Sequence, residues 1–418
     1  MPPVTLLIIG AGGRGTGYAE LARQWPERCR VVGVAEPHPL RRERLAERHA
    51  IPREAVFADW RAAALRPRFA DAVVITTQDA MHAEPAVAFA RLGYHMLLEK
   101  PMAPTEAECA RIVEAVKQTR PPIIFAVGHV LRYTRYTRLL KKMIADGAIG
   151  QLMGMQHMEP IGFWHFAHSY VRGNWRKESQ SSSMLLAKSC HDLDWIKHFM
   201  DARCARVASF GRLLYFRAEH RPAGAGERCM DCAIEASCAY SARRIYLERA
   251  LKGDFGWPVD VLTEDRTAAG IERALREGPY GRCAWSCDND VVDQQTVMME
   301  FEDGRTASFT ATAFTPMQGR HTRLFGTHGM LVGDSRRIEH HDFRSQTCKV
   351  MDTEAPDGTP LAGHGGGDYG FMDAFIAAVG ERDPSRILSG PEETLESHRM
   401  VFAAEASRRE GRVMEVAG

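Results

Sequence analysis

Three glycines near the N-terminus have the spacing of a loop that binds a dinucleotide. Gly10, Gly12 and Gly15 follow the apolar run 4–9 and precede a helical pattern. Glycine at the first place permits a tight turn, at the second a close approach of backbone to pyrophosphate, and at the third close packing of helix on strand. Free N–H groups at the start of the helix favour the phosphates. The sequence therefore predicts a dinucleotide site rather than a plain glycine-rich turn.

An acidic residue ends the second predicted strand, and its position bears on which dinucleotide binds. Glu36 lies about 20 residues after the glycine motif, where a carboxylate commonly binds the ribose 2′-hydroxyl. Because that carboxylate would repel a 2′-phosphate, NAD is predicted in preference to NADP. Arg41 and Arg42 follow closely, so NADP stays as the alternative, and Glu36 can also be interpreted as a solvated loop acid.

The predicted crevice also includes the segments that follow two later strands. Ligands bind at the carboxyl ends of the strands in open parallel sheets. Strands are predicted at 73–75 and 95–98, so the residues after them should face the cofactor. The predicted cofactor-binding residues are Gly10, Gly12, Gly13, Arg14, Gly15, Glu36, Thr76, Thr77, His82, Glu99 and Lys100.

Lys100 and His191 are the residues that best suit proton transfer. Removal of a hydride from an alcohol carbon needs a base for the hydroxyl proton, held at a fixed distance from the nicotinamide. Lys100 follows the predicted strand 95–98 at the edge of the crevice. A histidine such as His191 can take or return a proton near neutral pH. The alternative interpretations are a surface lysine and a buried core histidine.

A stretch dense in aromatic, histidine and arginine side chains precedes His191. Hydrogen-bond donors interleaved with flat apolar rings are typical of a carbohydrate pocket. The arginines can also hold a carboxylate, phosphate or sulfonate, whereas the alternative is a solvated basic loop. The predicted substrate-binding residues of this stretch are His165, His168, Arg172, Trp175 and Arg176.

Five cysteines form the most unusual constellation in the chain. A CxxC pair with a third cysteine nearby and two more downstream can supply four thiolates to a structural zinc ion. Zinc would stabilise a polar segment that has little apolar core of its own. An iron–sulfur cluster and free thiols are the alternatives. The predicted zinc ligands are Cys229, Cys232, Cys238 and Cys283, with Cys287 as an alternative fourth ligand.

Composition is that of an ordinary globular protein. The chain has 418 residues, 45% of them hydrophobic and 26% charged, with a formal net charge of +1. The length predicts two domains. The near-zero charge argues against nucleic acid or a membrane surface as a partner. The first residues lack a basic region before their apolar run, and no run of about 18 apolar residues occurs, so we expect a cytoplasmic location.

The patterns of apolar residues indicate which elements position these side chains. Strand and helix patterns alternate to about residue 128 and predict a doubly wound parallel sheet. Beyond it the alternation stops, which favours an α+β domain with an antiparallel sheet. Its predicted elements include strands at 206–216, 297–301, 306–314 and 321–325 and one helix at 185–200. The predicted domains are 1–128 and 129–418, with a cysteine-bearing insertion at about 218–289.

Several motifs together resemble the Gfo/Idh/MocA family of nicotinamide-dependent oxidoreductases. They are GAGGRG at 10–15, EKP at 99–101, GHVLRY at 128–133, DGAIGQL at 146–152 and HDLD at 191–194. The resemblance spans most of the chain and is weakest over 218–289. It implies a Rossmann domain, a C-terminal α/β domain with a large, mostly antiparallel sheet, NAD(P), and a sugar, cyclitol or sugar derivative as substrate. It also implies a homo-oligomer, a dimer or tetramer formed through the open sheet.

The resemblance implies roles for individual residues. Lys100 matches the family lysine that contacts substrate and cofactor, and His191 matches the histidine of the catalytic domain. Many members place an acid four residues before that histidine, where this chain has Ala187. Lys188 resembles a lysine found there in other branches and is the third predicted catalytic residue. The other substrate-binding residues expected from these motifs are Arg132 and Asp192.

Two activities fit these residues. One is NAD-dependent oxidation of a hydroxyl group of a sugar, glycoside or cyclitol. The other is NAD-dependent hydrolysis of a glycoside, with transient oxidation at C3, elimination of the aglycone, addition of water and return of the hydride; its substrate could be an anionic sugar. A non-catalytic NAD-sensing protein is a third alternative, for which Ala187 is the support. The loop His364–Asp368 either folds over the pocket or acts as a joint.

Overall fold

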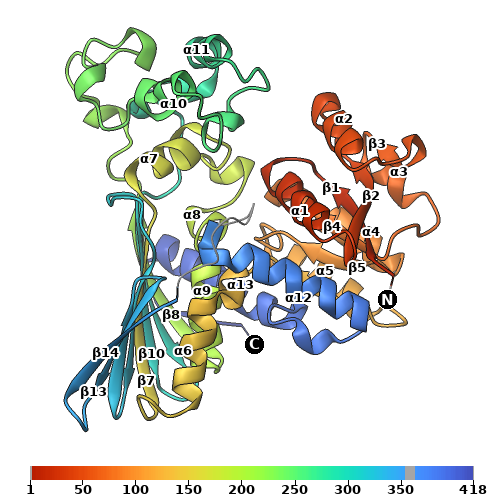
Figure 1. Cartoon of the computed structure of the whole chain (residues 1–418). Helices are drawn as coiled ribbons and strands as arrows, with labels where there is room; N and C mark the ends of the chain where they lie inside the picture. Colours follow the sequence, from red (N-terminus) through yellow and green to blue (C-terminus); the bar gives the residue numbers. More distant parts are fainter. Residues whose placement is uncertain (1, 354–362, 418) are drawn as a thin grey trace.

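A six-stranded parallel sheet forms the N-terminal part of the computed structural model, which describes residues 2–353 and 363–417 (Figure 1). The strand order is β3-β2-β1-β4-β5-β6, which confirms the predicted doubly wound sheet. The central strands are short apolar runs buried on both faces, as a parallel sheet requires. The strands are β1 (Val4–Ile9), β2 (Cys29–Ala35), β3 (Val56–Phe57), β4 (Ala72–Ile75), β5 (His95–Leu98) and β6 (Phe125–Val127).

Helices cover both faces of this sheet because alternate side chains of each strand point to opposite sides. Leu6 and Ile8 pack into one apolar cluster, and Leu7 and Ile9 into another. The first cluster is covered by α1 (Gly13–Gln24), α2 (Pro39–Arg48) and α12 (Gly367–Glu381), and the second by α3 (Trp60–Ala64), α4 (Ala83–Arg91) and α5 (Glu106–Lys117).

A nine-stranded sheet forms the second lobe. Its order is β14-β13-β12-β11-β7-β10-β9-β8-β15, and neighbouring strands are antiparallel except for β7 and β10. The prediction of a large, mostly antiparallel sheet is therefore confirmed. The strands are β7 (Leu152–Pro160), β8 (Cys204–Arg212), β9 (Gln294–Phe301), β10 (Thr306–Thr312), β11 (His321–Gly326), β12 (Gly329–Gly333), β13 (Arg337–Asp342), β14 (Thr347–Asp352) and β15 (Met414–Glu415).

One face of this sheet is packed against helices and the other is open. α6 (Arg135–Ala145) and α9 (Cys190–Met200) contribute to the apolar cluster that includes Val297 and Phe309 of the sheet. The sequence does not predict β13 and β14, because these outer strands read RIEHHD and TCKVMD and lack a regular apolar alternation.

The helix predicted at 185–200 is broken in the structure. α8 (Met184–Ala187) ends before Lys188, and α9 starts at Cys190. The carbonyl of Ala187 accepts a hydrogen bond from the Lys100 ammonium, with Nζ and O 2.6 Å apart. At this break, Lys100 of the first lobe therefore contacts the second lobe.

The end of the chain returns to both lobes (Figure 1). Phe371 and Phe375 of α12 belong to the same apolar cluster as Tyr18 of α1, so α12 completes the cover of the parallel sheet. α13 (Pro391–Glu410) packs against α5 of the first lobe and against α9 and β8 of the second. Residues beyond the predicted boundary at 128 therefore contribute to the apolar core of the first lobe.

The segment between β8 and β9 contains the predicted cysteine-bearing insertion. It includes α10 (Glu248–Leu251) and α11 (Ala268–Glu277), drawn in green shades in Figure 1 beyond α7 (Phe163–Phe166). A small apolar cluster that includes Tyr246, Ile271 and Leu275 holds it together. Within the residues described, no helix has the length and apolarity to cross a membrane.

Buried histidines should make the free energy of unfolding depend on pH. Burial lowers the pKa of His129 to about 4 and that of His398 to about 3. The unfolded chain takes up these protons near pH 6.5, whereas the folded chain takes them up only at lower pH, so the free energy of unfolding decreases as pH falls from about 6.5 towards 4. Burial raises the pKa of Asp368, but His364 and Arg14 outweigh it and lower that pKa to about 2, so the Asp368 contribution is lost at lower pH.

We expect a lower Tm at about pH 5 than at about pH 7.5 in differential scanning calorimetry. The pH dependence should be shallower in a His129→Asn variant, because one depressed histidine pKa has been removed. Equal Tm values at the two pH values would contradict this prediction.

Candidate functional site

The glycine loop has the geometry of a tight turn between β1 and α1. Gly10 has φ +90°, and a Cβ there would lie 2.9 Å from the Thr76 carbonyl oxygen. A Cβ at Gly15 would lie only 2.0 Å from the Gly10 carbonyl oxygen. At Gly12 and Gly13 a Cβ would meet no atom within 4 Å. The loop therefore has no space for a side chain at Gly10 and Gly15. It has free space at Gly12 and Gly13, where a pyrophosphate would approach.

Glu36 ends up against this loop, at the carboxyl end of β2. Its carboxylate accepts hydrogen bonds from the backbone N–H groups of Ala11, at 2.7 Å, and His38, at 2.8 Å. Both nearby arginines already have partners. Arg41 forms an ion pair with Glu264 of the inserted segment, and Arg42 donates to the carbonyl of Glu36 itself.

Arg14 ties the glycine loop to two other elements. Its guanidinium donates to Glu99 at 2.8 Å and to Asp368 of α12 at 2.6 Å. Tyr18 also donates to Glu99, at 2.7 Å. Burial alone would raise the pKa of Glu99, but the nearby Arg14 outweighs it and lowers that pKa. Glu99 and Arg14 therefore fix the wall from which Lys100 projects.

Thr76, Thr77 and His82 shape the loop after β4. The Thr76 hydroxyl donates to the Gly10 carbonyl at 2.7 Å. The His82 ring bonds the carbonyl of Pro101 at 2.7 Å and that of Thr77 at 3.1 Å. These contacts hold the loops after β1, β4 and β5 together at the carboxyl edge of the sheet.

Lys100 and His191 meet between the two lobes. Lys100 projects from the end of β5 to the Ala187 carbonyl, four residues before His191 in the chain. Burial lowers the pKa of the His191 imidazole well below its usual value, and the positive charge of Lys100 lowers it further. Nδ1 of His191 is buried and has no hydrogen-bond partner within the described part of the chain.

His364 brings a second imidazole to this place. Its Nδ1 lies 3.0 Å from a carboxylate oxygen of Asp368, and its ring centre is 5.5 Å from that of His191. The loop His364–Asp368 therefore folds over the site, as one of its two interpretations predicts. Because Asp368 also contacts Arg14, the imidazole of His364 is linked to the glycine loop.

Lys188 belongs to a chain of alternating charges. Lys188 pairs with Glu159 at 3.0 Å, Glu159 with Arg320 at 2.9 Å, and Arg320 with Asp192 at 2.5 Å. Asp192 also lies 3.1 Å from Nε2 of His157. Burial would raise the pKa of Asp192, but Arg320 holds it well below its usual range. This cluster therefore combines fixed cations and anions, which suits a polar ligand.

The comparisons with known sequences decide the family. Residues 4–129 match the family described as "Oxidoreductase family, NAD-binding Rossmann fold", and residues 141–416 match "Oxidoreductase family, C-terminal alpha/beta domain". The chain belongs to the Gfo/Idh/MocA oxidoreductase family. The resemblance in its short motifs is thereby confirmed.

Individual relatives carry more specific names. The chain is 26% identical to the 2,7-anhydro-N-acetylneuraminate hydratase of Escherichia coli over 46% of this chain and 50% of that protein. It is 33% identical to the levoglucosan dehydrogenase of Pseudarthrobacter phenanthrenivorans over 36% of this chain and 39% of that protein. The chain thus spans half or less of each of these two relatives.

A solved structure shares the whole fold. It is a levoglucosan dehydrogenase in complex with NADH and levoglucosan, which aligns over 100% of both chains with a TM-score of 0.72 and 18% identity. At 18% identity, this similarity shows only that this Gfo/Idh/MocA chain has the same fold as that protein.

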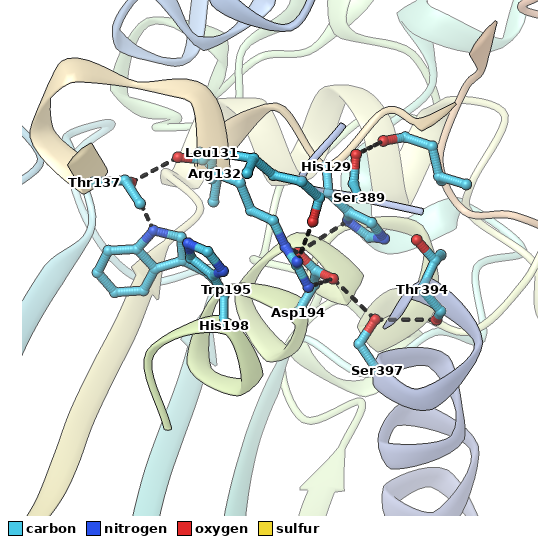
Figure 2. A network of polar contacts seen from close by, with 12 residues as sticks. His129, Leu131, Arg132, Thr137, Asp194, Trp195, His198, Ser389, Thr394 and Ser397 are labelled. Carbon is cyan, nitrogen blue, oxygen red and sulfur yellow. Dashed lines mark hydrogen bonds and ion pairs between the residues drawn. The ribbon is translucent and has the colours of Figure 1, made fainter. Parts of the chain in front are cut away.

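Two of the residues predicted to bind substrate have other partners. Figure 2 shows Arg132 beside Asp194, with two nitrogen–oxygen distances of 2.7 Å. Asp194 also accepts the Ser397 hydroxyl at 3.0 Å, so this buried group joins α9 to α13. Arg172 is only 1% exposed and donates to the carbonyls of Arg282 and Tyr240. The structure places both guanidinium groups inside the protein.

Of the other residues in the aromatic stretch, His165 lies near Lys188 and His168 lies against the insertion. The His165 ring is partly exposed and lies 5.0 Å from that of Trp257. Burial lowers the His165 pKa well below its usual value, as does the charge of Lys188. His168 is buried against Tyr280.

Trp175 and Arg176 connect segments around the cleft. The Trp175 indole donates to Asp79, after β4, at 3.2 Å. Arg176 pairs with Asp288 at 2.9 Å. The structure thus brings Lys100, Lys188, His165 and His191 together, and it gives Trp175 and Arg176 partners elsewhere.

The four predicted zinc ligands line one small cavity. Cys287 lies beside it, with its thiol 3.3 Å from the Cys283 carbonyl. In the described chain, however, no three of these sulfurs lie mutually within 4.8 Å. The residues converge, but the structure does not show a closed tetrahedral zinc site.

Sequence reasoning missed Glu159, Arg320, Asp79 and Trp257. Each is a single polar or aromatic residue outside a recognisable motif, and its partner lies far away in the chain. The one available signal was the polar residue Glu159 at the end of an otherwise alternating strand.

Proposed function

We propose that this enzyme oxidises a hydroxyl group of a sugar, glycoside or cyclitol and transfers the hydride to NAD. The observation that carries the proposal is the position of Lys100. Its ammonium projects from the carboxyl end of β5 and contacts the second lobe at Ala187, beside Lys188 and His191. A substrate held between the lobes would meet Lys100 and the cofactor crevice together.

Each residue at the site has a separate role in the proposed reaction. The glycine loop and Glu36 would hold NAD, which would supply the hydride acceptor for the carbinol carbon. Lys100 acts as the base from its neutral amine form. It takes the hydroxyl proton and becomes the ammonium that contacts the Ala187 carbonyl, and the imidazoles of His191 and His364 pass the proton on towards solvent, which restores the amine. Ala187 provides no side-chain acid, so its carbonyl positions Lys100 instead. The Asp368 carboxylate lies 3.0 Å from Nδ1 of His364 and orients this imidazole.

The names of the relatives support this substrate class. One acts on levoglucosan, as its name states, and another is named an inositol 2-dehydrogenase, from Pseudomonas fluorescens. The alternating charges from Lys188 to Asp192 offer donors and acceptors for several hydroxyl groups.

The test is a panel of sugars, glycosides and cyclitols with NAD, followed at 340 nm. We expect NADH to accumulate with at least one member. Tight NAD binding without reduction by any member would contradict the proposal.

A second activity, NAD-dependent cleavage or hydration without net redox change, is favoured by the hydratase relative and by the cations in the cleft. The same hydride transfer would open the reaction, and its reversal would close it. Lys188 and Arg320 could hold an anionic sugar. Aryl glycosides distinguish the two activities, because the second requires release of the aglycone without accumulation of NADH.

We propose NAD rather than NADP because the Glu36 carboxylate lies against the glycine loop, where it would repel a ribose 2′-phosphate, and because Arg41 and Arg42 have other partners. We expect calorimetric titration to show at least about tenfold tighter binding of NADH than of NADPH. A double variant, Glu36→Ser with Glu264→Gln, should narrow this difference, because it removes the repulsive charge and releases Arg41.

The matched control is Glu43→Gln. Glu43 lies on α2, as Arg41 does, and forms an exposed ion pair with Arg53, which lies beyond that helix. The substitution should leave the preference unchanged. Equal affinities of the wild-type protein for the two cofactors would contradict the assignment.

We also propose a cytoplasmic homo-oligomer, a dimer or tetramer, that associates through the open sheet face. Phe210 of β8 is 73% exposed and Val350 of β14 is 62% exposed, so this sheet presents apolar side chains that a partner could cover. None of the ten cysteines forms a disulfide in the described part of the chain, as a reducing compartment favours. Light scattering of the wild-type protein and of Phe210→Glu tests the association.

A further inference from the structure

Two short segments far apart in the chain bring five cysteines to one place. Cys229, Cys232 and Cys238 lie in the first segment, and Cys283 and Cys287 lie in the second. An isolated antiparallel bridge between Arg228 and Arg282 joins the segments immediately beside the first cysteine of each. These cysteines lie in the inserted segment and take no direct part in the proposed hydride transfer.

A buried guanidinium faces these cysteines without an acidic partner. Arg172 is 1% exposed, and within the described residues the ionisable groups acting on it are thiols and a tyrosine rather than a carboxylate. It donates to the carbonyls of Arg282 and Tyr240, both at 2.8 Å, and to Sγ of Cys229 at 3.5 Å. Its Nη1 has no partner among the residues described. A cation so deeply buried is costly unless a negative charge accompanies it.

The cysteines are the groups able to supply that charge. Cys229, Cys238 and Cys287 are among the ionisable neighbours of Arg172. A bound metal ion removes the protons from coordinating thiols and leaves a thiolate centre with net negative charge.

Hydrogen-bond donors also point at the sulfurs. The Gly226 N–H donates to Sγ of Cys232 at 3.3 Å, and Arg172 donates to Sγ of Cys229. Such outer contacts orient and stabilise thiolate ligands in metal sites. The cavity that the cysteines line has a volume of ≈10 Å³, which is room for about one water-sized particle.

We infer that these cysteines hold a thiolate-bound metal centre whose negative charge is balanced by Arg172. The cavity volume favours a single zinc ion over a larger cluster. Zinc would require the sulfurs to move inward, because tetrahedral ligands about 2.3 Å from the ion lie about 3.8 Å apart. An iron–sulfur cluster would use the same ligands and the same compensating cation.

The centre would also connect the inserted segment to the substrate side of the enzyme. Arg172 lies one turn after His168, whose ring stacks on Tyr280 of the insertion at 5.1 Å. Trp257, also of the insertion, lies against His165 in the cleft. We therefore expect the metal to hold Trp257 in place against His165. Loss of the metal should then raise KM for the substrate more than it lowers kcat.

The test is metal analysis of the full chain, purified without oxygen and without a metal-affinity step. Mass spectrometry of the elements should find about one zinc per chain, or about four irons with a broad absorption near 400 nm if the occupant is a cluster. Either result supports a thiolate centre and identifies its metal. Wild-type protein that contains neither zinc nor iron, and whose visible spectrum shows no thiolate bands after addition of Co²⁺, overturns the inference.

Alkylation separates metal loss from misfolding. In the wild-type chain the cluster cysteines should resist N-ethylmaleimide until a chelator is added, whereas the exposed Cys348 should react at once. Cys229→Ser and Cys283→Ser should lose the metal. Cys348→Ser, which alters a separate surface group with Glu339 and His341, should keep it. Metal retained by both cluster variants would also overturn the inference.

Discussion

Replacement of Lys100 by methionine is expected to lower kcat by about 10²–10⁴-fold, the range that positioned acid–base groups contribute. Methionine keeps most of the length of the side chain but loses the ammonium that contacts the Ala187 carbonyl. The side chain does not belong to the glycine loop, so NAD affinity should change far less than turnover. Steady-state rates at 340 nm and calorimetric NAD titration measure the two quantities separately.

The matched control is Lys142→Met. Lys142 is an exposed lysine of α6 that pairs with Asp146, just after the end of that helix. The substitution should leave kcat unchanged. If Lys100→Met retained more than about a tenth of the wild-type kcat, the proton would have to leave through another group. If kcat and NAD affinity fell together, Lys100 would instead be holding the cofactor crevice in shape.

The second large effect is expected at Gly15. A methyl group in Gly15→Ala would lie 2.0 Å from the Gly10 carbonyl oxygen and 2.6 Å from the Thr76 hydroxyl oxygen. Because backbone must shift to relieve this contact, we expect a loss of about 3 kcal/mol of unfolding free energy and no measurable NAD binding. Urea unfolding and calorimetric titration would measure these two effects.

Gly12→Ala provides the comparison within the same loop. Its Cβ would meet no protein atom within 4 Å, so unfolding free energy should stay within about 0.5 kcal/mol of the wild-type value. The methyl group would occupy the side open to the pyrophosphate, and NAD affinity should fall about tenfold, or about 1.4 kcal/mol. Equal effects of the two substitutions on stability would contradict the geometry described for the loop.

The parts of this protein that sequence predicts are those determined locally. The glycine motif, the buried strands β1 and β4, and the position of Lys100 after β5 follow from short patterns of residues. The break between α8 and α9 does not, because Lys100 contacts it from 87 positions away in the chain.

Long-range partners also explain the differing placements of the arginines. Arg132 and Arg172 have the residue type of anion-binding groups, but each is buried by segments that no local pattern connects to it. Arg320 lies outside any motif, yet its contacts with Glu159 and Asp192 place it in the cleft. Residue type was therefore informative about chemistry, and tertiary contacts determined which group was available for it.

The return of α12 to the first lobe has a consequence for protein engineering. A fragment ending at residue 128 would lack Phe371 and Phe375, and the apolar surface around Tyr18 would meet water. Such a fragment should be insoluble or aggregate when expressed alone, and a chimera that exchanges cofactor domains must transplant α12 with them. The lobe that binds the dinucleotide is thus not a portable module, although its signature motif occupies only the first residues of the chain.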